Sequence, residues 1–226
     1  MKYEKLEHFV SLPRLDRFLT ACDGSKTKAQ ELYKANLRVA ESFYPIMHLF
    51  EIFLRNTIYY KLTKYFGNPD WIVAEKSGFM SDKTLKPSKY FLKKQIESAE
   101  TRVRRRGGTI TSGKIIAEQM LGFWTSLFDT HHYKLLSGSI IHCFPNRPTE
   151  VQRKEINLKL DKIREFRNRV YHNEPVCFNG NKIDFREAMK IKKEILEVLG
   201  WIDHDIAKYI NQFDNVDAKI HLALSL

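Results

Sequence analysis

The sequence predicts an all-α protein, a helical bundle of about six or seven helices in a single compact domain over residues 1–226. Three observations predict this class. Apolar residues recur at helical spacing through most of the longer segments. No run of alternating polar and apolar residues between turn signals indicates a strand. With 43% hydrophobic residues, of which the aromatic ones make up 12% of the chain, there is enough apolar surface for a core.

Three helices are expected in the first part of the chain. The first covers residues 12–19, where apolar residues share one face at i, i+3 and i+4. The second begins near Lys26 and is expected to kink or break at Pro45, which cannot continue a helical hydrogen-bond ladder. From 46 to 66 the apolar residues cover most of the circumference, which is typical of a central helix rather than a surface one.

The middle of the chain is expected to alternate between turns and helices. Residues 67–70 form a turn, after which Trp71 is expected to dock on the core. Residues 75–88 have the composition of a loop. A helix over 89–106 then ends in a run of arginines and two glycines, which is typical of a helix end that opens into a loop. The segment 115–136 is again apolar and aromatic.

Two further helices are expected toward the C-terminus. After a proline-containing loop at 144–148, a helix over about 149–173 is expected, with Thr149 as its N-cap. The Asn-Gly-Asn segment 179–181 predicts a turn, and a last amphipathic helix is expected over about 184–213.

The charge of the chain favours an anionic partner. Its 38 Lys and Arg against 27 Asp and Glu give a net charge of +11, and each phosphate that a cation neutralises releases condensed counterions. Charge alone does not distinguish RNA, DNA or an acidic membrane surface. The sequence shows no long apolar run of the kind that signal peptides or membrane spans contain, so a soluble, cytoplasmic protein with no membrane partner is expected.

Neither a metal site nor a cofactor is expected. The three cysteines are widely spaced and form no CxxC pair, which argues against a disulfide framework or a cysteine zinc site and fits a reducing cytosol. His131-His132 and His142-Cys143 match no standard zinc spacing, and adjacent residues of a helix point about 100° apart. Gly107-Gly108 is not followed by the Lys-Ser/Thr pair of a phosphate-binding loop.

Candidate chemistry concentrates in the segment 163–175, which combines arginines, amides and one histidine ahead of a proline. Asn168 and His172 are four apart and share a helix face, whereas Arg167 and His172 lie about 140° apart around the axis. Pro175 is expected to stop the helix soon after His172, where the helix dipole favours a cation. Histidine, whose ordinary pKa lies near neutrality, suits general acid–base work. Taken alone, His172 is better interpreted as a helix-end cap than as a catalytic residue.

Three ordered motifs carry a resemblance to a known family. Residues 167–172 (Arg-Asn-Arg-Val-Tyr-His) resemble the Arg-polar-x-x-x-His signature of HEPN-domain ribonucleases, and the flanking 163–175 resembles the Abi-like (abortive infection, AbiD/AbiF-type) branch. Residues 50–56 with the aromatic turn at 65–71 are similar to that branch's N-terminal motif, and 121–128 to its central Gly-Phe-Trp motif. Together the matches cover about residues 30–180.

The resemblance implies a homodimer in which two Arg-x4-His motifs share one cleft and cleave RNA without a metal, leaving a 2′,3′-cyclic phosphate and a 5′-hydroxyl. His172 would be the base toward the 2′-hydroxyl or the acid toward the leaving oxygen. Arg167 would stabilise charge on the phosphorane, and Asn168 would orient the phosphate or the imidazole. The biological role implied is that of a phage-defence abortive-infection or toxin effector, held in check by a protein or RNA antitoxin.

Two further sets of residues stay open between a functional and a structural interpretation. Glu51, Arg55 and Asn56 match the N-terminal motif and would support the site, but a buried polar network that fixes the bundle is equally expected. Tyr171 stands where the pattern tolerates several residues and is given no catalytic role. The remaining candidates are expected to contact RNA phosphates or to form a solvated basic face: Arg164, Arg169, Arg102, Arg104, Arg105 and Arg106.

Two other classes of function remain open from the sequence. A non-catalytic RNA-binding module that holds a regulatory RNA would use the same charge and the same arginines. A helical adaptor for a protein partner would not bind RNA in a salt-dependent way at all. The chemistry of the products separates the enzyme from both.

Overall fold

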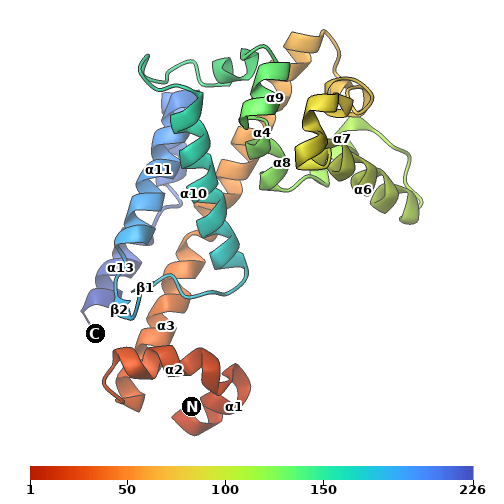
Figure 1. Cartoon of the computed structure of the whole chain (residues 1–226). Helices are drawn as coiled ribbons and strands as arrows, with labels where there is room; N and C mark the ends of the chain where they lie inside the picture. The colour runs from red at the N-terminus through yellow and green to blue at the C-terminus, as the bar shows by residue number, and fades with distance from the viewer. Residues whose placement is uncertain (226) are drawn as a thin grey trace. The chain divides into compact units, whose positions relative to one another are not determined.

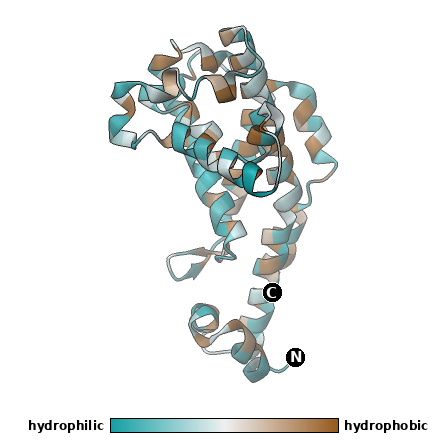
Figure 2. Ribbon diagram, turned by 90° about the vertical axis from the view of Figure 1, so that its right-hand side faces the viewer, coloured by the Kyte–Doolittle hydropathy of each residue, from teal (hydrophilic) through white to brown (hydrophobic). Residues whose placement is uncertain are grey.

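In the computed structural model, which describes residues 1–225, the chain is a succession of helices joined by short turns (Figure 1). These residues form thirteen α-helices, three 3₁₀ helices and one two-stranded hairpin. The prediction of an all-α fold is confirmed. The expected six or seven helices were too few, because short turns divide segments that are continuously apolar in the sequence. Along many helices polar and apolar residues separate into two faces (Figure 2).

The chain contains two compact units, each built from segments that are distant in the sequence. Unit 1 consists of Met1–Leu49, Glu165–Glu197 and the residues from Ala207 onward. Unit 2 consists of Phe50–Arg164 and Val198–Ile206. The single domain over 1–226 stays a prediction.

Helices from both ends of the chain build unit 1. α3 packs against α2 and α13. The predicted helix at 12–19 is confirmed within α2, and the predicted start near Lys26 is confirmed by a side-chain cap, in which Ser25 Oγ accepts a hydrogen bond from the backbone N–H of Lys28. The first helix, α1, was not anticipated. These elements are α1 (Tyr3–Val10), α2 (Leu12–Ala21), α3 (Lys26–Ser42) and α13 (Val216–Leu224).

The expected interruption at Pro45 is a clean break between two helices. α3 ends at Ser42 and α4 (Tyr44–Phe66) begins two residues later, with Pro45 in the first turn, where its missing N–H breaks no hydrogen bond. Between the helices Phe43 is fully buried, and its ring packs 4.8 Å from that of Phe166. The break thus places an aromatic anchor of unit 1 directly before the first turn of α4.

Unit 2 contains mostly short helices around large aromatic side chains. Trp71 is fully buried, stacks on Phe66 at 6.0 Å and donates from Nε1 to the Tyr59 carbonyl, which confirms the prediction that it docks on the core. The region 75–88, expected to be a loop, contains two 3₁₀ helices. The elements are α5 (Trp71–Ala74), η1 (Phe79–Ser81), η2 (Lys83–Ser88), α6 (Phe91–Arg105), α7 (Ser112–Ala117), α8 (Leu121–Ser126), α9 (Thr130–Leu135) and η3 (Ser139–Cys143).

The helix that carries the Arg-x4-His motif, α10 (Arg153–Tyr171), starts later than predicted. Thr149 does not cap it. Instead, the backbone N–H of Gln152 donates to Glu155 Oε2 at 3.1 Å, which is the return bond of a capping box. Gln152 is not a residue type preferred at N-caps, so this helix start is stabilised by the Glu155 carboxylate and not by a cap side chain.

The last expected helix, at about 184–213, is in fact two helices, and a third follows. α11 (Arg186–Ile202) is separated from α12 (His204–Asn211) because Asp203 Oδ1 accepts the N–H of Asp205 at 2.7 Å and starts a new helix. Asp214 does the same for α13, accepting the N–H of Val216 at 3.0 Å. Before α11, strands β1 (Phe178–Asn179) and β2 (Lys182–Ile183) form a small antiparallel hairpin around the predicted turn.

No helix among residues 1–225 is both long enough and apolar enough to cross a membrane.

Candidate active site

The C-terminus of α10 closes with a Schellman motif that places His172 at the C-cap. The N–H of Glu174 donates to the carbonyl of Arg169 at 2.8 Å, and the N–H of Asn173 donates to the carbonyl of Val170 at 3.2 Å. Asn173 adopts the left-handed conformation that this motif requires, with φ 57°. The helix therefore ends before Pro175 is reached, and His172 stands directly at its end rather than within its last turn.

At this helix end an imidazole and an amide face solvent one turn apart. His172 and Asn168 are both exposed, and the N–H of His172 donates to the Asn168 carbonyl at 2.8 Å. The shared face predicted from their spacing is thus present. Because both side chains are accessible, a phosphate group can approach the imidazole and the amide together.

The guanidinium of Arg167 is held by a neighbouring ring. Its Cζ lies 4.0 Å from the centroid of the Tyr171 ring, and its Nη1 lies 3.5 Å from Asn168 Oδ1. The Tyr171 ring in turn packs against that of Tyr44 from the start of α4, with centroids 5.0 Å apart and planes inclined by 31°. We call Arg167, Tyr171 and Tyr44 the aromatic cluster. A half-buried guanidinium over a ring face has fewer rotamers than one in solvent, which limits its motion before a ligand arrives.

Sequence reasoning missed the two tyrosines of this cluster. The spacing of Arg167 and Tyr171, four residues apart on one helix, was an available signal for their contact. Tyr44 gave no such signal, because it belongs to a different helix and only the fold brings it to Tyr171.

The two other arginines of the segment make ion pairs within their own units. In unit 1, Arg169 donates to Glu187 Oε2 at 2.6 Å and to the Pro175 carbonyl at 2.8 Å, so it fastens the loop after α10 to the start of α11. In unit 2, Arg164 pairs with Asp161 at 2.9 Å. These contacts give both arginines a structural task, and contact with RNA remains a prediction for them.

The central Gly-Phe-Trp motif meets the opening arginine of the segment inside unit 2. A methyl group added at Gly122 of α8 would lie 3.8 Å from Cδ of Arg164, which is ordinary van der Waals contact. Phe123 and Trp124 of the same motif are buried in the core. Within unit 2, Gly122 of the central motif therefore lies close to the Arg164 side chain.

The arginines at the end of α6 are engaged by carboxylates. Arg102 Nε and Arg106 Nη1 reach the two oxygens of Glu118 at 2.6 and 2.5 Å, and Arg104 lies 3.8 Å from buried Glu100. The hydrogen bond from Arg102 holds the pKa of the Glu118 carboxyl below its usual range, against the opposing effect of burial. Arg105 is exposed on the same helix. Much of the positive charge of this run is thus offset locally.

The polar residues of the N-terminal motif lie in unit 2 and are half-buried. Arg55 Nε is 3.5 Å from Asn56 Oδ1, a long and weak hydrogen bond, and Glu51 lies one turn before Arg55 on α4. Their half-buried positions are compatible with a polar network and with a supporting role, so both interpretations stay open.

The histidine pair 131–132 has a structural explanation. His132 is only 2% exposed, and burial lowers the pKa of its imidazole. Its Nδ1 lies 2.7 Å from the Ser126 carbonyl, so Nδ1 carries the proton and the ring joins α9 to α8. Within residues 1–225 no group of three His, Cys, Asp or Glu side chains is arranged to hold a metal ion.

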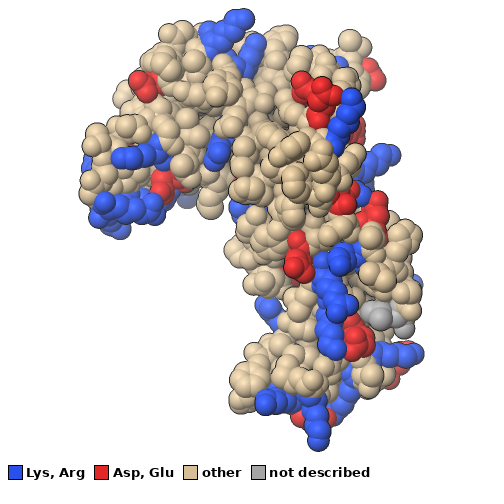
Figure 3. All heavy atoms as spheres, turned by 180° about the vertical axis from the view of Figure 1, so that it is seen from behind, with Lys and Arg blue, Asp and Glu red and all other residues tan. Residues whose placement is uncertain are grey.

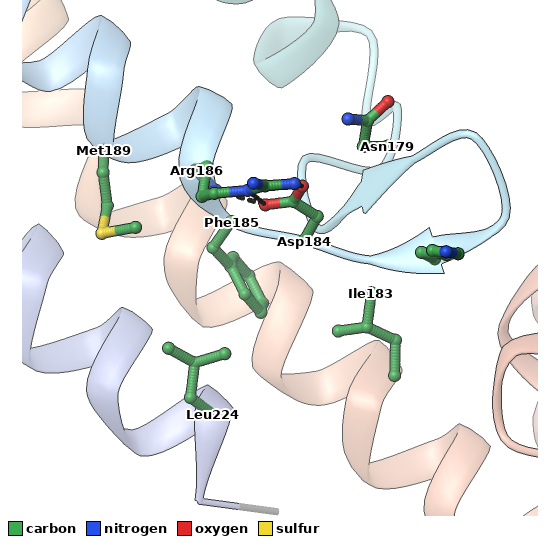
Figure 4. A pocket seen from close by; sticks show the side chains of 8 residues that line it. Asn179, Ile183, Asp184, Phe185, Arg186, Met189 and Leu224 are labelled. Atoms are coloured by element: carbon green, nitrogen blue, oxygen red, sulfur yellow. Dashed lines mark hydrogen bonds and ion pairs between the residues drawn. The ribbon is translucent and has the colours of Figure 1, made fainter.

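A cavity of about 290 Å³ in unit 1 offers a second place for a ligand, next to the small hairpin (Figure 4). Two of its three charged side chains are paired with each other, since Arg186 Nη2 lies 2.6 Å from Asp184 Oδ2 and the Arg186 hydrogen bond lowers the pKa of Asp184 to about 2; the third is Lys182. A permanently ionised carboxylate paired with arginine is a poor proton donor or acceptor at neutral pH. The cavity is therefore a weaker catalytic candidate than the end of α10.

Acidic side chains accompany the Lys and Arg side chains on the face drawn in Figure 3. The net charge of +11 alone therefore does not single out one RNA-binding surface. Comparisons of the chain with protein-family models, with curated proteins and with solved structures found no match. The functional assignment accordingly rests on the residues and contacts described above.

Proposed function

We propose that the chain is a metal-independent endoribonuclease of the Abi-like HEPN type, acting in the cytoplasm as an abortive-infection or toxin effector against phage. The observation that carries the proposal is the end of α10, where exposed His172 stands at the C-cap one turn after exposed Asn168 and directly follows Tyr171, whose ring holds the Arg167 guanidinium. Its second support is the resemblance of three ordered motifs to that family.

The chemistry follows from the groups present. A neutral imidazole removes the proton of a ribose 2′-hydroxyl, and the oxygen attacks the adjacent phosphorus. The bond from phosphorus to the 5′-oxygen breaks, and that oxygen takes a proton from an acid. The products are a 2′,3′-cyclic phosphate and a 5′-hydroxyl. Arg167 stabilises the extra negative charge on the phosphorane, and Asn168 donates a hydrogen bond to a phosphate oxygen.

The proposed assembly is a homodimer with a composite site. One histidine serves as base while a different group must protonate the leaving oxygen, and a second copy of His172 supplies that acid. The position of Arg167, about 140° around the helix from His172, also favours phosphate contacts from more than one copy. An antitoxin, protein or RNA, would then act by covering this composite site or by preventing its formation.

The proposal is tested by the products of RNA incubated with the purified protein in excess EDTA. Cleavage should continue, and the new ends should be 2′,3′-cyclic phosphate and 5′-hydroxyl, identified by mass spectrometry and by resistance of the 3′ ends to enzymatic ligation. Inhibition by EDTA that a divalent ion reverses would contradict the metal-independent mechanism. Salt-sensitive binding without any cleavage would identify a non-catalytic RNA-binding module instead. Absence of binding would favour an adaptor for a protein partner.

A further inference from the structure

The aromatic cluster of unit 1 has a property that the cleavage chemistry does not use. Arg167 already covers the Tyr171 ring at 4.0 Å, and Tyr171 contacts Tyr44 at 5.0 Å. Tyr44 is 43% exposed even though the residues on either side of its helix start, Phe43 and Ile46, are fully buried. The cluster therefore presents a tyrosine to solvent that contributes comparatively little to the core.

We propose that Tyr44 is a stacking site for one unpaired nucleobase of the RNA, adjacent to the phosphate that His172 acts on. This inference rests on the proposed function and adds to it a base-binding subsite. It implies that the substrate is single-stranded at this position, since a base inside a duplex is not available for stacking on a protein ring.

The geometry supports a base at this position for two reasons. Tyr171 directly precedes His172 in the chain, so a base that stacks on Tyr44 lies within one or two nucleotides of the imidazole. In addition, the Tyr44 ring packs against Tyr171, whose own ring lies under the Arg167 guanidinium, and this packing reduces the entropic cost of ordering Tyr44 when a base binds. Proteins that bind single strands use this combination of positive charge and aromatic faces.

Another exposed tyrosine on α4 offers a matched comparison. Tyr60 is 68% exposed and packs edge-to-face on Tyr59, with ring centroids 5.3 Å apart. Like Tyr44, it is an exposed tyrosine of α4. Unlike Tyr44, it lies in unit 2 and is not part of the aromatic cluster. Tyr60→Leu is therefore the control for a non-specific effect of removing a surface tyrosine.

The test uses two ten-nucleotide probes that cannot be cleaved because their 2′ positions are methylated. One is an oligoadenylate, and the other has the same backbone with every base removed. The parent protein should bind the adenylate more tightly, and Tyr44→Leu should lower that affinity by roughly 5- to 150-fold, as removal of one stacked base predicts. Binding of the abasic probe should be unchanged, as should the slope of log affinity against log salt, because phosphate contacts are retained. Tyr44→Phe and Tyr60→Leu should bind as the parent does.

Three results would overturn the subsite: equal affinity of Tyr44→Leu and parent for the adenylate, an equal loss with the abasic probe, or the same loss in Tyr60→Leu. Circular dichroism of each variant identifies one that fails to fold, and Tyr44→Gln then takes its place. The parent's preference for the adenylate over the abasic probe is a requirement that needs no variant. If the parent cleaves RNA but Tyr44→Leu binds normally, the subsite fails while the proposed function stands. If the parent neither binds nor cleaves RNA, both fail.

Discussion

Two arginine-rich helix ends, those of α6 and α10, share one backbone design. In each, a left-handed residue follows the C-cap, Gly107 with φ 70° in α6 and Asn173 with φ 57° in α10. In each, the next N–H returns to a carbonyl five residues earlier, at 3.0 Å for Gly108 and 2.8 Å for Glu174. Both ends therefore collect positive side chains where the helix dipole favours them.

The two ends differ in the residue at the cap and in what surrounds it. The cap of α6 is Arg106, which is paired with Glu118, whereas the cap of α10 is His172, which is exposed and has exposed Asn168 one turn before it. A run of arginines is thus a weak signal of function, because carboxylates of the same unit can form ion pairs with the guanidiniums. An imidazole left accessible at the cap is the stronger signal, because histidine is the side chain used most often in acid–base catalysis.

The largest expected effect separates the two caps directly. His172→Ala should lower the rate of RNA cleavage by about 10²- to 10⁴-fold, because it removes the proposed acid–base group. Arg106→Ala, at the equivalent position of α6, should leave the rate within about twofold. Single-turnover cleavage of a labelled RNA measures both. Equal losses in the two variants would mean that the ends do not differ in function.

The second largest loss of activity is expected from replacing Arg167 of α10. Arg167→Lys keeps the charge but loses the planar fork of donors, so the rate constant for cleavage should fall by roughly 10²-fold. Arg104→Lys in α6 is the matched control and should change the rate little. The comparison uses the rate constant at saturating RNA. A change in RNA affinity alone would assign Arg167 to binding rather than to the transition state.

The shared backbone design predicts a stability effect at both ends. Gly107→Ala should lower the free energy of unfolding by about 1 kcal/mol, because a Cβ is disfavoured in the left-handed region. Asn173→Gly should raise it by a few tenths of a kcal/mol, since asparagine tolerates this conformation less well than glycine does. Urea unfolding at neutral pH measures both. Destabilisation by Asn173→Gly would point to a side-chain role for Asn173.

The ion pairs of α6 predict a dependence of stability on pH. The Glu118 pKa is lowered in the folded protein, chiefly by the Arg102 hydrogen bond, so Glu118 stabilises the fold above its unfolded pKa near 4.5. This contribution should disappear as the pH falls through the lower folded pKa. Urea midpoints of the parent and Glu118→Gln should therefore differ at pH 7 and converge only once the pH falls below the lowered pKa of the folded carboxyl. A constant difference would show that the ionised carboxylate is not responsible.

The smallest expected effect concerns RNA binding by α6. Replacing Arg104 and Arg105 together by glutamine should leave the salt dependence of RNA affinity unchanged if this end is a solvated, ion-paired face. If instead either arginine binds an RNA phosphate, its removal should reduce the slope of log affinity against log salt by about 0.7 per phosphate for a single strand. A reduction of that size would show that the arginines at the end of α6 bind RNA.

Features governed by neighbouring residues were predictable from the sequence. Spacing and turn chemistry predict the helical class and the break at Pro45. They also predict that Trp71 docks on the core after its turn and that α6 ends at its two glycines. Errors arose where two local signals competed. Thr149 was predicted as the N-cap of α10, but the helix starts after Gln152. Asp203 begins a new helix within a segment whose apolar pattern predicted one continuous helix.

The sequence by itself determined that Asn168 and His172 share a face at a basic helix end, because helical spacing is a local property. Only the tertiary structure decided that the Arg102 and Arg106 guanidiniums meet Glu118 and that Tyr44 lies against Tyr171. Such contacts join different helices, and no periodicity within one segment encodes them. They depend on how the helices pack around the core. They distinguish the end of α6, where arginines pair with Glu118, from the end of α10, where His172 and the Tyr44 ring are exposed.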